Sequence, residues 1–224
     1  MFHYAAANAN LDAWKCLVSN NVKSSKDMGE AKDGRTPLHA CVAARRSANL
    51  SEVLERFPQF VAAKDKKKLT PLLIASKLGD AESMKLLMER KAKANDASGF
   101  FKYTPLCYAA VGNHKDTLKF LLSYCSTVQQ KTKLDKGDKY GRTPLMLATR
   151  YGRNHVFSEL LRRGADALVE DTSKNTALHY AAAYNRLDHV KLLLKHTKAN
   201  PSAENVWRTT PLSVAMLKGH FSIV

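Results

Sequence analysis

Thr36-Pro37-Leu38-His39 is the first of six near-copies of one tetrapeptide, and these copies decide the fold. The other five copies begin at Thr70, Thr104, Thr143, Thr176 and Thr210. Successive threonines are therefore 34, 34, 39, 33 and 34 residues apart. A fixed period near 33 residues indicates a solenoid, in which each unit buries its apolar face only against its neighbours. We expect the function to lie on a surface built across several units, and not in a catalytic pocket.

Equivalent positions of the copies carry the same kinds of residue. A leucine follows each threonine by two positions, and a small residue follows it by five, namely Cys41 in the first copy and alanine in the others. The small residue lets two helices approach closely, while the leucine fills the core between units. Threonine can cap a helix, and proline fits a first turn that needs no N–H partner. Each unit is thus predicted to contain a first helix of about two turns and a second helix after it.

The signature Thr-Pro-Leu-His-x-Ala at this period resembles the ankyrin repeat family, and the resemblance covers essentially the whole chain. It implies an all-α solenoid of stacked helix–turn–helix units with β-hairpin-like fingers between them. We expect a single array over residues 1–224 with about seven repeats, anchored near residues 1, 36, 70, 104, 143, 176 and 210. Because both ends fall inside a repeat, we expect a fragment of a longer protein.

Two repeats deviate from this pattern. Residues 45–49 read as a stretch about three residues longer than its counterparts, and Pro58 is predicted to end the following helix early. Residues 126–139 contain an insertion of about six residues that includes Lys131 and Lys133. Insertions in solenoids often lie on the binding face, but a solvated loop that is simply tolerated remains an alternative.

The finger residue two positions before each threonine leaves the turn type open. Glycine occupies this position only at Gly34 and Gly141. The other four copies have basic residues there, which do not favour one turn type: Lys68, Lys102, Lys174 and Arg208.

Composition and charge limit the possible classes of function. The 36 Lys and Arg against 20 Asp and Glu give a net charge of +16, which favours acidic partners, polyanions or anionic surfaces. The sequence has no apolar run long enough to span a membrane and no secretory signal at its start. The four cysteines have no C-x-x-C spacing and fit buried thiols in a reducing compartment. We expect an intracellular protein, cytoplasmic or nuclear, that is monomeric.

No catalytic or metal-binding motif is recognisable. The sequence contains no Gly-rich phosphate loop, no G-x-S-x-G and no H-E-x-x-H. Five of the eight histidines fall at two repeated positions, for which a structural role is predicted: His3, His39, His179, His114 and His220. The other three, His155, His189 and His196, share no face or ligand pattern. We therefore predict neither an enzyme nor a bound cofactor or metal.

By the same resemblance, the ligand faces the concave surface formed by the finger tips and the exposed edge of the first helix. These positions are basic here, and they are aromatic in the C-terminal half. The sharpest feature is Phe100-Phe101-Lys102-Tyr103, because three aromatic residues at an exposed tip add nothing obvious to the core. The predicted partner-binding residues are Lys66, Lys67, Lys77, Phe100, Phe101, Tyr103, Tyr140, Arg142, Arg150, Tyr151, Tyr184 and Trp207. The alternative is that some tips fold back on neighbouring repeats.

Three functions fit this surface. The first is a non-catalytic protein-interaction module for an acidic or mixed peptide, with aromatic anchors and with Arg142, Arg150 and the finger lysines as carboxylate partners. The second is a nucleotide, oligonucleotide or polyanion-binding domain that regulates an attached enzyme, in which bases stack on the aromatics. The third is an aromatic cage for a methylated lysine, against which the positive surroundings argue.

Overall fold

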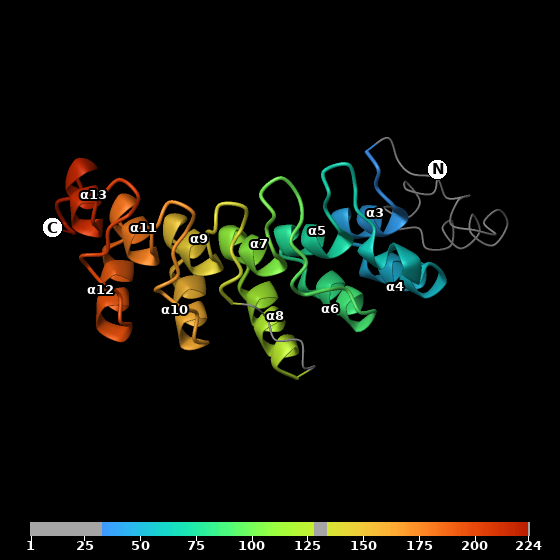
Figure 1. Ribbon diagram of the computed structural model, residues 1–224. Helices are drawn as coiled ribbons and strands as arrows, with labels where there is room; N and C mark the ends of the chain where they lie inside the picture. Colours follow the sequence, from blue (N-terminus) through green and yellow to red (C-terminus); the bar gives the residue numbers. More distant parts are fainter. Residues whose placement is uncertain (1–32, 128–133, 224) are drawn as a thin grey trace.

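The computed structural model describes residues 33–127 and 134–223. The partial repeat expected near residue 1 and the inserted Lys131 and Lys133 lie outside these ranges. The described residues form eleven α-helices and one 3-10 helix, with one isolated β-bridge between Ser98 and Tyr103. The helices follow one another as pairs in a single row from the blue to the red end of the chain (Figure 1). The all-α solenoid expected from the period is confirmed.

The first helix of each pair begins one residue after the repeated threonine. These helices are α3 (Pro37–Ala43), α5 (Pro71–Leu78), α7 (Pro105–Gly112), α9 (Pro144–Arg150), α11 (Ala177–Ala183) and α13 (Pro211–Leu217). At Thr70, Thr104, Thr143 and Thr210, the hydroxyl accepts the N–H of the residue three positions on. The predicted capping role is confirmed there, because these N–H groups have no partner inside the helix.

The two remaining threonines are followed by the signature histidine, which links neighbouring repeats. The Nδ1 atom of His39 accepts the backbone N–H of Thr36 at 3.0 Å, and its Nε2 lies 3.0 Å from the carbonyl oxygen of Leu69 in the next finger. His179 makes the same two bonds to Thr176 and Thr209. Because Nδ1 is the acceptor, each ring is neutral with its hydrogen on Nε2. Burial lowers the pKa of both histidines, in keeping with this structural role.

The second helices form another row beneath the first helices (Figure 1). They are α4 (Ser47–Arg56), α6 (Ala81–Glu89), α8 (Lys115–Thr127), α10 (Asn154–Arg162) and α12 (Leu187–His196). The small residues five positions after the threonines are fully buried, as are five of the six repeated leucines. The exception is Leu212 of α13, which is 47% exposed at the end of the described row. Burial against the following repeat therefore forms the core.

Basic residues at the entrance to the second helices cap the first helices of the preceding repeats. The carbonyl groups at a helix C-terminus lack intrahelical partners and attract donors and positive charge. The side chain ten positions after the threonine contacts such a carbonyl in four repeats: His114 with Lys77, Arg153 with Val111, Arg186 with Arg150, and His220 with Ala182. The structural role predicted for the two histidines is confirmed.

The prediction of a longer segment at residues 45–49 is wrong. Helix α4 begins at Ser47, eleven residues after its threonine, and α10 begins at the same distance after its own threonine. The deviation comes after α4, which ends at Arg56 and is followed by the 3-10 helix η1 (Pro58–Ala62). Since proline has no N–H to continue the hydrogen-bond ladder, the predicted early end at Pro58 is confirmed.

All six finger tips adopt the same left-handed conformation two positions before the threonine. The φ angle there is 72° at Gly34 and 74° at Gly141, and it is between 53° and 59° at the four basic residues. The turn type that the sequence left open is therefore the same in every repeat. Lysine and arginine occupy this conformation despite the cost of placing a Cβ there.

Replacing Lys174 with glycine is expected to raise the free energy of unfolding by about 0.5–1 kcal/mol, because glycine relieves this strain. Urea denaturation measures the change. Lys191→Gly, in the middle of α12, is the matched control and is expected to lower stability by about 1 kcal/mol. Equal destabilisation by both substitutions would contradict the argument.

Candidate functional site

The finger tips and the C-terminal ends of the first helices make up one face of the array, away from the second helices (Figure 1). Backbone hydrogen bonds join adjacent tips, for example from Lys139 N–H to the Phe101 carbonyl at 2.9 Å and from Thr172 N–H to the Tyr140 carbonyl at 2.9 Å. We call this the finger face and define it by its exposed and half-buried residues: Lys66, Lys67, Lys77, Phe100, Phe101, Lys139, Tyr140, Arg150, Tyr151, Tyr184 and Trp207.

An aromatic cluster occupies the tips of two adjacent fingers. Phe100 is 76% exposed, and Phe101 and Tyr140 are about 40% exposed. The Phe100 and Phe101 rings meet edge to face with centroids 5.0 Å apart. The Lys139 Nζ atom lies 3.5 Å from the Phe100 centroid and 4.9 Å from that of Tyr140, so its charge is held against both rings. The cluster presents apolar area and positive charge together.

Tyr103 does not belong to this surface, which corrects the prediction. It is 7% exposed, and its ring stacks on Phe101 and meets Tyr108 edge to face. Leu69, at the equivalent position of the preceding repeat, is buried as well. The residue directly before the capping threonine turns beneath the finger, towards the first helix. Burial raises the pKa of Tyr103 to about 12.

Arg142 occupies the same inward position, and its prediction as a carboxylate partner is also corrected. Its guanidinium is bound to the Asp138 carboxylate, with Nη2 to Oδ2 at 2.6 Å and Nε to Oδ2 at 2.8 Å. The other carboxylate oxygen of Asp138 accepts the backbone N–H groups of Tyr140 and Arg142. Both side chains are buried, so this cation stabilises the finger and is already paired.

Arg150 lies in a different setting, between two tyrosines. Its Cζ atom is 5.7 Å from the centroid of Tyr151 and 5.3 Å from that of Tyr184, and both tyrosines are a little under 40% exposed. Tyr184 stacks on Tyr180, whose hydroxyl donates to Asp171 at 2.8 Å. Because the protein's own cation lies against the two rings, the site does not suit a methylated lysine.

The remaining predicted residues are accessible, and the charge around them is positive. Lys66, Lys67 and Lys77 are exposed, and Trp207 is 67% exposed. The finger carboxylates accept backbone N–H groups of their own fingers and face inward, at Asp65, Asp138 and Asp171. They form a repeated acceptor five positions before the threonine, continued by Asn205, whose side chain makes the same turn. This recurrence was present in the sequence and identifies the residues that shape the tips.

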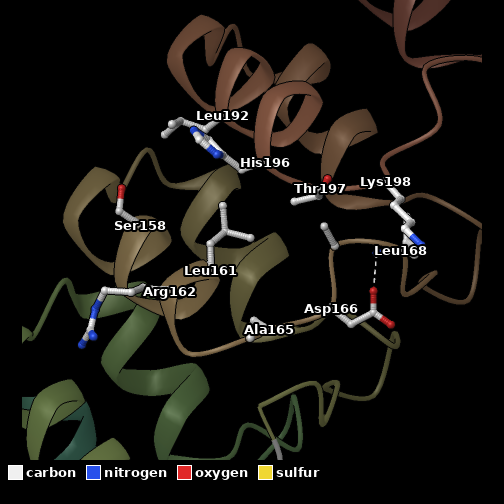
Figure 2. A pocket seen from close by; sticks show the side chains of 12 residues that line it. Ser158, Leu161, Arg162, Ala165, Asp166, Leu168, Leu192, His196, Thr197 and Lys198 are labelled. Atoms are coloured by element: carbon white, nitrogen blue, oxygen red, sulfur yellow. Dashed lines mark hydrogen bonds between the residues drawn. The ribbon is translucent and has the colours of Figure 1, made fainter.

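A cavity of about 560 Å³ lies between the C-terminal ends of α10 and α12 (Figure 2). Leu161 of α10 points towards α12, and Leu168 and Leu192 add to the apolar lining. Its charged residues have partners, because Arg162 is bound to Glu159 and Asp166 accepts the N–H of Leu168. No hydrogen bond joins Ser158 to His196 within the described ranges, so the cavity presents no activated nucleophile.

Two further searches were confined to residues 33–127 and 134–223. They contain no group of three or more His, Cys, Asp or Glu residues placed to hold a metal ion. None of their helices is long and apolar enough to cross a membrane.

Comparison with known proteins identifies the repeat. The family profile described as "Ankyrin repeats (3 copies)" matches residues 2–98, 43–132, 72–171 and 154–224. Neurogenic locus notch homolog protein 1 of Xenopus tropicalis is 32% identical over 170 residues, which cover 75% of this chain and 6% of that protein. Poly [ADP-ribose] polymerase tankyrase of Caenorhabditis elegans is 30% identical over 260 residues, covering 99% and 10%. Inversin of Canis lupus familiaris is 34% identical over 196 residues, covering 87% and 14%.

The chain spans no more than 14% of the length of these three relatives, whose matches concern their repeats. The family profile covers nearly every residue, and the helix pairs recur with the period of the repeated threonines. The chain belongs to the ankyrin repeat family.

Proposed function

We propose that the chain is a non-catalytic protein-interaction module that binds an acidic peptide or domain on its finger face. Ankyrin repeats are generally protein-interaction modules, since the stacked units present an extended surface to a partner. The observation that carries the proposal is the exposure of Phe100, Phe101, Tyr140 and Trp207 on one face. Exposed aromatic area of this size is costly in water and is typical of binding surfaces.

The charge of the same face defines the class of partner. Lys66, Lys67 and Lys77 are exposed, and Lys139 is held over the aromatic cluster. The carboxylates of Asp138 and Asp171 are taken up by their own fingers. An acidic segment would meet cations that remain available, whereas a basic segment would be repelled.

The double substitution Phe100→Ala/Trp207→Ala is expected to weaken peptide binding by about 30-fold or more, because large exposed aromatics dominate such interfaces. Peptides are first selected from a random displayed library with the unsubstituted chain. Their affinities for both proteins are then measured by fluorescence polarisation. The substituted side chains are mostly exposed, so folding should be unaffected.

The matched control is Leu168→Ala/Leu194→Ala, which removes two comparably exposed leucines, one after α10 and one in α12. This variant should bind the selected peptides as the original chain does. Equal loss in both variants would mean that the finger face is not the binding surface.

A second candidate is an oligonucleotide or polyanion-binding domain that regulates an attached enzyme. It is favoured by the same pairing of Lys139 with Phe100 and Tyr140, since bases stack on aromatics beside cations. A single-stranded oligonucleotide competitor separates the two functions. Displacement of the peptides with a steep dependence on salt would support the polyanion function.

We also propose that residues 1–224 form one monomeric array of about seven repeats, with an insertion at residues 126–139. The helix pairs of the described residues and the coverage of the family profile support this extent. An intracellular location, cytoplasmic or nuclear, is part of the same proposal. Cys41 and Cys107 are buried thiols, and burial raises their pKa values to about 12 and about 11.

A further inference from the structure

We infer that Arg150, together with Tyr151 and Tyr184, forms a receptor for a single carboxylate of the bound peptide, from an Asp or Glu side chain. This inference rests on the proposed function and assigns one position of the ligand. The chemistry is bidentate binding of an oxyanion by a guanidinium whose faces are covered by aromatic rings.

The two tyrosines occupy equivalent positions of adjacent repeats. Each lies eight residues after its threonine, at the C-terminal end of α9 or α11. The other repeats have no aromatic residue there, so this junction differs from the rest of the array. The equivalent residues are Ala44, Leu78, Gly112 and Lys218.

The N–H groups of Arg150 are available to a ligand. Within the described ranges no hydrogen bond or ion pair involves its guanidinium, which lies within 6 Å of both tyrosine centroids. A guanidinium carries its five N–H donors in its own plane, where ring faces cannot accept them. Other arginines of the described chain have acceptors, as Arg142 has in Asp138 and Arg153 has in the Val111 carbonyl.

The carboxylates of the neighbouring fingers are already occupied. Asp138 binds Arg142. Asp171 accepts the Tyr180 hydroxyl and the N–H groups of Ser173 and Asn175. The charge of Arg150 is thus left for an external anion.

The structure also restricts the motion of this cation. Tyr180 and Tyr184 stack with an interplanar angle of 6°, and Tyr180 is anchored at 2.8 Å to Asp171. A cation that stacks on ordered rings loses less freedom when it binds, which favours affinity. Its single positive charge matches a carboxylate, whereas a phosphorylated residue carries a charge of about −1.5 to −2.

The first experiment records the arginine Nε–Hε NMR signals of the full chain, with Arg150 assigned from the Arg150→Gln variant. The probe acetyl-Gly-Glu-Gly-amide is expected to produce a saturable shift of the Arg150 signal. The Arg142 signal should not move, because its Nε already donates to Asp138. The neutral control acetyl-Gly-Gln-Gly-amide should leave both signals in place.

An Arg150 signal that does not move, or that moves equally with the glutamine peptide, would overturn the carboxylate receptor. Acetyl-Gly-phosphoserine-Gly-amide forms the third arm of the titration. Tighter saturation by the phosphopeptide than by the glutamate peptide would also overturn the carboxylate assignment, in favour of phosphate as the source of the oxyanion.

The second experiment is a double-mutant cycle with the peptides selected above. Replacing the critical Asp or Glu of a peptide by its amide is expected to cost about tenfold in affinity for the original chain and less than about twofold for Arg150→Gln. Equal losses would overturn the receptor while peptide binding itself stands. Failure to select any peptide, with a saturable Arg150 shift, would refute the proposed function and support the anion site.

Discussion

Replacing Arg142 with alanine is expected to lower the free energy of unfolding by about 3–5 kcal/mol. The Asp138 side chain is 0% exposed, and the 2.6 Å contact with Arg142 neutralises its charge. Without the guanidinium, a buried carboxylate keeps its backbone donors from Tyr140 and Arg142 but loses its counter-charge. Urea denaturation followed by circular dichroism measures the loss.

Arg150→Ala is the matched control, because it removes the same side chain from the next first helix. Its guanidinium contacts tyrosine rings and makes no ion pair within the described ranges, so the change in stability should stay within about 0.5 kcal/mol. Similar losses for both variants would contradict the division of the two arginines into a structural and a binding residue.

A rescue variant tests the cause of the Arg142→Ala effect. Asn205 makes the same finger turn with a neutral side chain, accepting the N–H groups of Trp207 and Thr209. Adding Asp138→Asn to Arg142→Ala should therefore recover more than half of the lost stability, since it removes the unpaired charge and keeps the acceptor. No recovery would show that packing of the arginine stem, and not charge, is responsible.

Lowering the pH from about 7 to about 5 is expected to reduce the free energy of unfolding by about 2 kcal/mol through His189 alone. This side chain is 1% exposed and stacks on Phe157 with ring centroids 3.8 Å apart. Its Nε2 atom is 3.0 Å from the Asn154 side-chain oxygen. Burial, with a smaller effect from the charge of Arg186, lowers the pKa of His189 to about 4, against the small opposing effect of Asp188.

The direction of the pH effect follows from the two protonation states. The unfolded chain takes up a proton on His189 near pH 6.5, whereas the folded chain does so only near pH 4. Between these values the unfolded state binds more protons, so stability falls as the pH falls through this window. The lowered pKa values of His39 and His179 act in the same direction.

Urea denaturation at several pH values, with the original chain and with His189→Gln, measures this contribution. The glutamine variant should show a smaller fall in stability between neutral and mildly acidic pH. His155→Gln, at an exposed position one residue after the start of α10, is the control and should follow the original chain. Identical pH dependence of the original chain and His189→Gln would refute the assignment.

The histidines show where reasoning from sequence succeeds. His39 and His179 stand in the signature itself, so their structural role follows from the repeat, and the structure supplies the bonds to Leu69 and Thr209. His189 stands at no repeated position, and the sequence gives no sign of its burial. Its stacking on Phe157 depends on how α12 packs against α10, which is a property of the assembled array.

The finger tips show the same division. Lysine disfavours the left-handed conformation, so Lys68 by itself argues against the turn that it adopts. The assembled fingers impose that turn, since the carbonyl of Lys68 accepts the N–H of Gly99 in the next finger. Local preference is weaker here than the hydrogen bonds between repeats.

The sequence by itself determined the period, the all-α class and the starts of the first helices. These properties are local or periodic, because a capping threonine, a proline in the first turn and a leucine every repeat act within a few residues or between identical units. Only the tertiary structure decided which finger-face residues are free. Tyr103 and Arg142 lie at exposed-looking positions but turn beneath their fingers, whereas Arg150 remains open between two tyrosines. The difference depends on side-chain direction and on partners in adjacent elements, which a one-dimensional pattern does not contain.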